Sequence, residues 1–380
     1  MRRFLLIVVV MALAVGIGAQ SKKTLEIYIA DTEGGKAALY VSPSGETLMI
    51  DSGNPGGRDT DRIMAMLGDA GVKRIDYLVS THYHVDHVGG MPELAKRVPI
   101  AHYIDHGPNV EVRPQGQDFQ AAYTELQSKA KHTVVKPGDR VPIAGFEFRI
   151  VTAGGEALKK PLPGGGQPNP LCAKFQKKED PTSPDENAQS VGAVISYGQF
   201  RAIDLGDLLW NKEFELMCPN NQVGTVDIYM VTHHGLDRSG PEVLVHGARP
   251  RVAVMQNGTR KGGSVPAYQI MRSSPGLEDI WQLHWSYSGG IEHNPAGVFI
   301  ANVDDPAVIA NVLTSPPGQR GGNPPAAASG GQAPPAQGAV SQPAHSPAYY
   351  LKISAQDDGS FTVTNTRNGF TKTYPPRRTT

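Results

Sequence analysis

The feature that most constrains this chain is a run of four metal-binding side chains, His82, His84, Asp86 and His87, directly after the short apolar segment 77–80. The segment is typical of a buried strand, and two glycines behind the run indicate a turn. Residues two apart in an extended chain point to the same side, so His82 and His84 are expected to reach one ion. Beyond the turn, Asp86 and His87 are placed to serve a second ion. Imidazole and carboxylate suit zinc, manganese or iron, whereas a merely solvated loop would not need this ordered spacing.

The rest of the chain alternates strand-like and helix-like segments in two halves. In the first half we expect strands at 25–29, 38–41, 47–50 and 77–80, and helices at 59–70 and 92–97. In the second half we expect strands at 146–151, 192–197, 200–205, 226–231 and 252–255, and helices at 210–217 and 241–246. Strands in each half with helices outside them predict an α/β fold of two sheets face to face under helical covers.

The composition divides the chain into four parts. Residues 1–20 have a basic start, an apolar run and small residues at the end, which is typical of a cleaved signal peptide. A main domain is expected over 24–312, and residues 313–347 have the Pro/Gly/Ala/Gln composition of a linker. Residues 348–378 predict a short β-hairpin around Asp358-Gly359. An isolated hairpin is marginal in water, so we expect it to dock on the main domain or to be a fragment of a surface module.

The leader predicts an exported protein, periplasmic or extracellular. The alternative is an uncleaved anchor, but the apolar run is shorter than the roughly 20 residues that a spanning helix needs. No later segment predicts a membrane span. In an oxidising compartment Cys172 and Cys218 would be able to pair, although two free thiols are equally consistent with the sequence. The stretch 154–189, rich in Gly, Pro and Lys, predicts a lid, a substrate loop or disorder.

The overall charge gives no sign of a polyanionic partner. Lys plus Arg and Asp plus Glu both number 36, so the net charge is zero. Such a chain has no broad field that attracts nucleic acid. Nuclease action on extracellular DNA, with loop lysines such as Lys174 meeting phosphates, is therefore a weaker alternative than a small or oligomeric substrate.

Several blocks in order resemble the metallo-β-lactamase superfamily over about residues 25–286. The blocks are the H-x-H-x-D-H run itself, Met49–Gly53 (Asp-x-Gly), the lead-in strand Ile75–His82, the Gly-Asp block Ile203–Leu208, and the strand-end His-His-Gly of Asp227–Gly235. The last form, with Ser190–Val194 before the Gly-Asp block, is most similar to the hydrolase domain of ComEC-type DNA-uptake proteins and their free-standing relatives. The resemblance implies a four-layer αβ/βα sandwich.

The resemblance also implies a role for each polar residue. His82 and His84 would hold a first metal, and Asp86 and His87 a second. Asp207 would bridge the two ions, and His234 would complete the second site, with His233 as the alternative ligand, an outer group or a catalytic residue beside Asp86. Asp51 would orient a ligand from outside the cage, or would be a plain turn-forming residue. One or two divalent ions are implied, zinc first, with manganese or iron as alternatives.

One departure from the family pattern concerns the first metal. Many members add a further histidine between the first motif and the Gly-Asp block. The candidates here, His102, His106 and His132, all come early, and the usual region holds Asn187 and Ser190 instead. The first ion would then be weakly held or missing, unless His284 closes the site from the C-terminal side.

The predicted function is hydrolysis by a metal-bound hydroxide. Two ions lower the pKa of bound water and stabilise the attacking and leaving oxygens. The resemblance puts phosphodiesters first, followed by other esters. Lactone or β-lactam opening on the same fold is one alternative, and a non-catalytic metal-containing binding module is another, because a fold alone does not fix a reaction.

Overall fold

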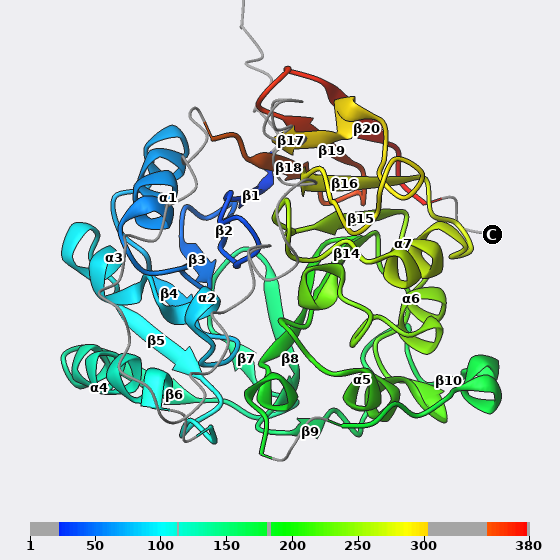
Figure 1. Ribbon diagram of the computed structural model, residues 1–380, viewed down its shortest axis with the longest axis horizontal. Coiled ribbons are helices and arrows are strands. Elements are labelled where there is room, and N and C mark those ends of the chain that lie inside the picture. Colours follow the sequence, from blue (N-terminus) through cyan, green and yellow to red (C-terminus); the bar gives the residue numbers. More distant parts are fainter. Residues whose placement is uncertain (1–22, 112–113, 181–183, 303–347, 378–380) are drawn as a thin grey trace, which may run out of the picture.

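A computed structural model describes residues 23–111, 114–180, 184–302 and 348–377 (Figure 1). The expected signal peptide at 1–20 and the linker at 313–347 lie outside the described residues, as does the end of the main domain as we bounded it, 303–312. Within the described part, no helix is both long and apolar enough to cross a bilayer.

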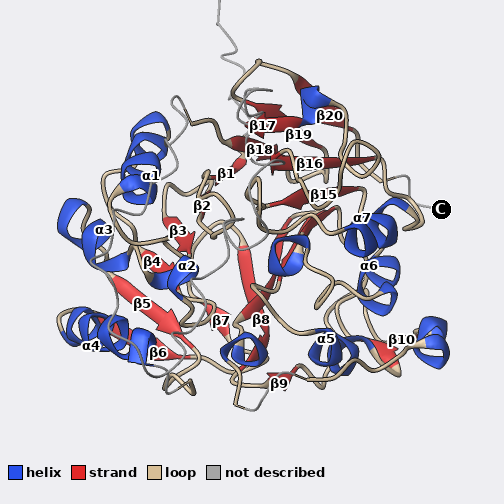
Figure 2. Cartoon of the chain, viewed as in Figure 1, coloured by secondary structure: helices blue, strands red, loops and turns tan. Residues whose placement is uncertain are grey.

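Two nine-stranded mixed sheets form the centre of the molecule (Figure 2). The first has the order β20 (Thr371–Tyr374), β19 (Phe361–Asn365), β18 (Leu351–Ala355), β1 (Leu25–Ile29), β2 (Ala38–Val41), β3 (Thr47–Ile50), β4 (Tyr77–Val79), β5 (His102–Asp105) and β6 (Lys131–Val134). The second has the order β17 (Ile300–Asn302), β16 (Asp279–His284), β15 (Val252–Met255), β14 (Ile228–Met230), β12 (Phe200–Asp204), β11 (Gly192–Tyr197), β8 (Glu147–Ala153) and β7 (Arg140–Val141), with β9 (Glu156–Ala157) on β8. A small pair, β10 (Gln167–Pro168) and β13 (Asn220–Asn221), lies apart from both.

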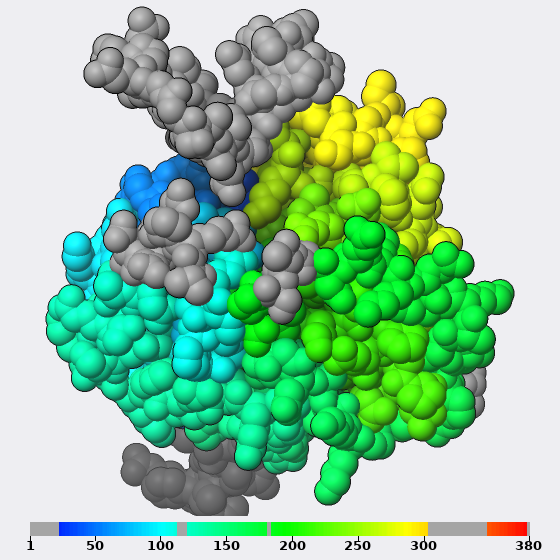
Figure 3. Space-filling model, turned by 60° about the horizontal axis from the view of Figure 1, so that its bottom comes forward, coloured from blue at the N-terminus to red at the C-terminus, as the bar shows by residue number. Residues whose placement is uncertain are grey.

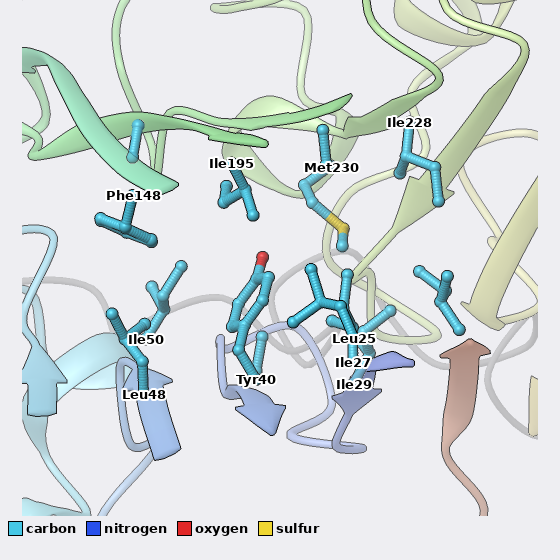
Figure 4. Packing of buried hydrophobic residues seen from close by; sticks show 14 of the residues in the cluster. Leu25, Ile27, Ile29, Tyr40, Leu48, Ile50, Phe148, Ile195, Ile228 and Met230 are labelled. Carbon is cyan, nitrogen blue, oxygen red and sulfur yellow. The ribbon is translucent and has the colours of Figure 1, made fainter. Parts of the chain in front are cut away.

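Side-chain alternation along the strands explains why these sheets stack. Leu25, Ile27 and Ile29 of β1 point into the core between the sheets, whereas Tyr28 belongs to the outer core. Figure 4 shows the inner side chains of β1–β3 facing Phe148, Ile195, Ile228 and Met230 of the second sheet. The predicted pair of facing sheets is therefore found.

Helices cover the outer face of each sheet. The first sheet carries α1 (Arg58–Asp69), α3 (Met91–Arg97) and α4 (Pro114–Ser128), and the second carries α5 (Trp210–Met217), α6 (Glu242–Ala248) and α7 (Val265–Arg272) (Figure 1). In α1 the apolar residues Ile63, Met66 and Leu67 recur at helical spacing and are all buried. The result is a four-layer α/β sandwich, as expected. The sequence analysis did not identify α4, α7, β5, β6 or β16.

The C-terminal strands complete the first sheet. β18 pairs antiparallel with β1, with Ile27 opposite Ile353, and β19 pairs with β18. The sequence predicted the β18–β19 hairpin but missed β20, which adds to β19. Trp281 of the second sheet donates from Nε1 to the Tyr374 hydroxyl of β20 at 3.0 Å, so this extension also contacts the other sheet.

A disulfide fixes part of the long stretch 154–189. Cys172 and Cys218 are bonded, with their Cα atoms 5.8 Å apart. The bond joins the short 3-10 helix Pro170–Lys174 to the end of α5. Of the two alternatives that the sequence left open, the structure has the bond.

Candidate metal centre

The candidate residues meet where parallel strands of both sheets end. β3 and β4 are parallel, as are β12, β14 and β15. Asp51 follows β3, the His82–His87 run follows β4, Asp207 comes after β12, and His233 and His234 come after β14. Carboxyl ends of parallel strands share one edge, where open α/β sheets bind their ligands. Figure 3 shows one face of the molecule, on which residues of the first half (blue to cyan) lie beside residues of the second half (green to yellow).

Four side chains form a compact cage between the two sheets. Asp86, His87, Asp207 and His234 each offer one ligand atom, and these atoms all lie within 4.8 Å of one another. Oδ2 of Asp207 lies 3.3 Å from Nε2 of His87 and 3.2 Å from Nε2 of His234. Oδ2 of Asp86 lies 3.3 Å from the same two nitrogens. This is the set expected for the second ion, brought together from residues 86 to 234.

The unsatisfied atoms of the cage fit a bound cation. Nε2 of His87, Nε2 of His234 and Oδ1 of Asp207 are buried without a hydrogen-bond partner. Leaving such groups unpaired in the interior costs about 1–3 kcal/mol each. A divalent ion would satisfy them together, because nitrogen and carboxylate oxygen are its ordinary ligands.

His82 and His84 lie next to this cage. Nε2 of His82 is 2.9 Å from Nδ1 of His84, and the His82 ring centroid is 4.1 Å from that of His87. The two nitrogens thus face each other, as the spacing of two predicts, but neither residue belongs to the group of potential metal ligands among the described residues. No described histidine joins them from the region between the first motif and Asp207, where the chain has Asn187 and Ser190.

Each histidine at the site has one ring nitrogen that faces away from the other candidate ligands and contacts a neighbouring side chain or backbone carbonyl. His87 Nδ1 lies 2.7 Å from Asp51 Oδ2, and His234 Nδ1 lies 2.9 Å from the Gln256 carbonyl. The remaining contacts are 3.1 Å each: His82 Nδ1 to Thr81 Oγ1, His84 Nε2 to Glu111 Oε1, and His233 Nδ1 to Ser239 Oγ. Such outer contacts fix the ring orientation and leave the inner nitrogen for a metal.

Asp51 holds the His run from behind. Besides its contact with His87, it accepts from the Thr81 backbone N–H at 2.8 Å and the Thr81 hydroxyl at 2.7 Å. It is fully buried and has φ 58, so it forms a turn and also orients a ligand. The turn is therefore found, and Asp51 contacts His87 from outside the cage; its role toward a metal stays a prediction.

The buried carboxylates of the cage favour a positive charge beside them, either a protonated histidine or a bound cation. Burial opposes charge on His87, but Asp207, Asp86 and Asp51 outweigh it and raise the pKa of His87 well above its usual value. Burial also opposes ionisation of Asp207, yet the neighbouring histidines, His234 first, hold its pKa well below the ordinary range. Burial lowers the pKa of His82 well below its usual value. A metal bound by the inner nitrogen of His87 would therefore replace a proton there.

His233 lies beside the cage rather than in it. Its Nε2 is 3.5 Å from Oδ2 of Asp207, and burial lowers its pKa to about 4, so it is neutral at pH 7. His233 and His234 both have left-handed backbone angles, with φ 54 and 55. Consecutive residues other than glycine in this region are strained, and such strain gathers at functional sites.

Two glycines let the loops approach closely enough to form the site. A Cβ on Gly206, which has φ +60, would lie 2.8 Å from Cβ of Thr81. A Cβ on Gly262 would lie 2.0 Å from the carbonyl oxygen of His234. Any side chain at either position would push apart the segments that carry the ligands.

The other histidines that the sequence singled out have partners elsewhere. Nε2 of His102 lies 2.8 Å from the Thr133 hydroxyl, and Nε2 of His132 lies 2.8 Å from Asp105. His106 pairs with buried Glu186 at 3.0 Å. His284 lies 2.6 Å from Asp31, and the group of potential ligands at the cage does not include it among the described residues.

Two residues at the site were missed from the sequence. Glu111 contacts His84, and the ammonium of Lys261 forms an ion pair with Asp86 Oδ2. Lys261 stands on a turn fixed to the His-His-Gly segment, because Gly263 N–H donates to the His234 carbonyl at 3.0 Å. Asp86 and Lys261 have side chains 17% and 34% exposed, whereas His87, Asp207 and His234 are at most 3% exposed. Asp86, which pairs with Lys261, is thus the most exposed of the four cage residues.

Comparisons with known proteins agree with this architecture. Residues 31–167 match the family model "Metallo-beta-lactamase superfamily". A hydroxyacylglutathione hydrolase of Citrobacter koseri is 36% identical over 78 residues, which is 20% of this chain and 24% of that protein. The chain spans about a quarter of the length of the hydroxyacylglutathione hydrolases it matches.

Solved structures give a broader but fainter likeness. The metallo-beta-lactamase fold protein YhfI of Bacillus subtilis has 10% identity and a TM-score of 0.43, covering 69% of this chain and 96% of that one. A diphosphatase from the PhnP family has 12% identity and a TM-score of 0.34, covering 61% and 87%. Together with the two facing sheets under helices, the family-model match shows that this chain has the metallo-β-lactamase superfamily fold.

Proposed function

We propose that this protein is a metal-dependent hydrolase that acts on an ester-type centre, with phosphodiesters first. The observation that carries the proposal is the cage of Asp86, His87, Asp207 and His234, whose ligand atoms come from both sheets and stay partly unsatisfied in the interior. A purely structural cluster would not need a partly exposed side. The matched curated relatives are, by name, hydrolases.

Each residue of the site has its own proposed role in metal binding or in the reaction. Asp86, His87, Asp207 and His234 would hold one ion, and His82 with His84 would face a second that shares Asp207. A bound divalent ion supplies a water nucleophile near neutral pH and charge stabilisation for the leaving oxygen. Zinc fits this mixed nitrogen and oxygen set best, with manganese or iron as alternatives. His233, whose Nε2 lies 3.5 Å from Oδ2 of Asp207, would contact the bound substrate or water from beside the cage.

Lys261 favours a substrate that carries negative charge. Its ammonium lies at the exposed side of the cage and contacts Asp86, the most exposed of the four ligands. An ion bound by Asp86 would share that carboxylate with the Lys261 ammonium. An anionic group of the substrate could then pair with the ammonium in place of Asp86. This favours phosphodiesters over neutral lactones. The His-His-Gly form supports a place near the ComEC-type hydrolase domains.

The test is a hydrolase assay on purified protein loaded with zinc or manganese. Bis-p-nitrophenyl phosphate, a lactone and a β-lactam are offered in parallel, and metal content is measured by elemental analysis. We expect phosphodiester turnover that falls by about 100-fold or more in His84→Ala and Asp86→Ala, with His293→Ala as the control. Activity that survives both substitutions contradicts the proposal. Opening of the lactone or β-lactam alone supports the alternative reaction, and bound metal without any turnover supports a binding module.

We further propose that the protein works outside the cytoplasm. Stable disulfides belong to oxidising compartments, and Cys172 is bonded to Cys218. The signal-like residues 1–20 support the same conclusion. Cell fractionation of the tagged chain, with and without residues 1–20, tests it; equal amounts of both forms in the cytoplasm would contradict it.

A further inference from the structure

A buried ion pair joins the two sheets beneath the cage. Nζ of Lys36 lies 2.7 Å from Oδ1 of Asp204, and their side chains are 3% and 2% exposed. Lys36 belongs to the loop between β1 and β2, and Asp204 ends β12. The pair therefore connects the first sheet with the second at the edge where the ligands gather.

The lysine end is attached to the segments that carry Asp86 and Asp51. The backbone N–H of Lys36 donates to the Asp86 carbonyl at 3.1 Å. Its own carbonyl accepts from the Gly53 N–H at 2.9 Å, two residues after Asp51. A shift of Lys36 would thus move two of the loops that form the cage.

The aspartate end is attached to the segment that carries Asp207. Oδ1 of Asp204 also accepts from the Gly206 N–H at 3.1 Å. Gly206 packs against Thr81, and Asp207 follows it directly. Oδ1 of Asp204 therefore pairs with Lys36 of the first sheet. The same oxygen also positions the turn before Asp207 on the second sheet.

Stability alone does not account for this pair. Two charges removed from water are a weak source of stability, and apolar residues of similar shape often replace such a pair without loss. Oδ2 of Asp204 is buried without a hydrogen-bond partner, which adds to the cost. A pair that costs so much and that touches three ligand-bearing segments is better placed to set their separation.

We propose that Lys36 and Asp204 are a positioning pair that fixes the distance between Asp86 and Asp207 and so sets the metal affinity of the cage. The inference rests on the metal site of the proposed function but not on the reaction. Neither residue belongs to the cage. Removing the pair should change how tightly the cage closes on an ion, while the two sheets remain packed.

The experiment measures zinc affinity rather than turnover. The double variant Lys36→Met/Asp204→Leu removes both charges, and Asp204→Asn keeps an oxygen for the Gly206 N–H while weakening the lysine contact. Zinc binding to the full chain is measured by competition with a chromophoric chelator, and unfolding in urea is followed with EDTA present. Arg251→Met is the control, since Arg251 is a buried cation paired with Glu278 at the opposite ends of the strands, before β15.

We expect the double variant to unfold at nearly the wild-type urea concentration and to bind zinc about 10- to 100-fold more weakly. Asp204→Asn should lose affinity in the same direction, and the control should not. Wild-type affinity in either folded pair variant overturns the proposal. Failure of both variants to fold overturns it too, because the pair would then be structural. If the wild type binds zinc but hydrolyses none of the substrates, the proposed function is contradicted, whereas the positioning role of the pair is not.

Discussion

A buried glutamate in the second sheet's helical layer makes stability depend on pH in an unusual direction. Glu213 of α5 is fully buried, and burial raises its pKa to about 8, against the pull of the Gly240 N–H at 2.7 Å. Its other oxygen has no hydrogen-bond partner. In the unfolded chain the pKa returns to 4.5. Between these two values the folded state binds more protons than the unfolded state, so stability falls as pH rises.

The size of the effect follows from the two pKa values. Each pH unit between them costs about 1.4 kcal/mol, and the full interval from 4.5 to about 8 costs roughly 5 kcal/mol. Glu213→Gln removes this titration and keeps an oxygen for the Gly240 N–H. The stability of the variant relative to the wild type should therefore increase steadily from pH 5 to about pH 8 and then level off.

Urea unfolding of both proteins in EDTA at half-unit pH steps measures this difference. Titrations shared by both proteins, including those of the metal cage, cancel in the comparison. Glu215→Gln is the matched control, because Glu215 lies two residues away, is exposed and pairs with Lys212. A difference for Glu213→Gln that stays flat across this range would refute the reasoning, and so would an equal slope for the control.

Four further outcomes are expected. Zinc at about 1,000 times its dissociation constant should raise the free energy of unfolding by about 4 kcal/mol, which urea unfolding with and without EDTA measures; no change would mean that the cage binds nothing. Asp51→Asn should weaken zinc binding about 10- to 100-fold, since His87 loses its charged partner, and chelator competition would show whether it does. Lys261→Met should raise KM for bis-p-nitrophenyl phosphate more than for neutral p-nitrophenyl acetate; equal changes would speak against an anion-binding role. Cys172→Ser with Cys218→Ser should cost about 2–4 kcal/mol of stability in thermal or urea unfolding, and an unchanged midpoint would show that the disulfide is dispensable.

Local patterns predicted the parts of this fold that depend on neighbours in sequence. The strands β1, β2 and β3 and the helix α5 have the bounds that the sequence indicates, because alternation or helical spacing is written within each segment. β5 was missed because its ends are His102 and Asp105, polar residues that are buried only once β4 and β6 flank them. The missed α4 has a weak apolar pattern and so gives little signal.

The site divides in the same way. The His82–His87 run was readable from spacing alone, whereas Asp207 and His234 were expected only from the family resemblance. Lys36, Glu111 and Lys261 gave no signal. Each is a single charged residue in a loop, and its role arises from partners far away in sequence, such as Asp204 for Lys36. Tertiary contacts of this kind are not encoded in any short window.

The pairing of β18 with β1 has a consequence for synthesis. β18 comes after every strand of the second sheet in the chain, so the strand that pairs with the outer edge of β1 is made long after β1 itself. Until then its backbone N–H and C=O groups are open to other chains, as on any uncovered sheet edge. The first sheet is therefore completed late. A chain interrupted before residue 351 would leave this edge of β1 uncovered and prone to aggregation.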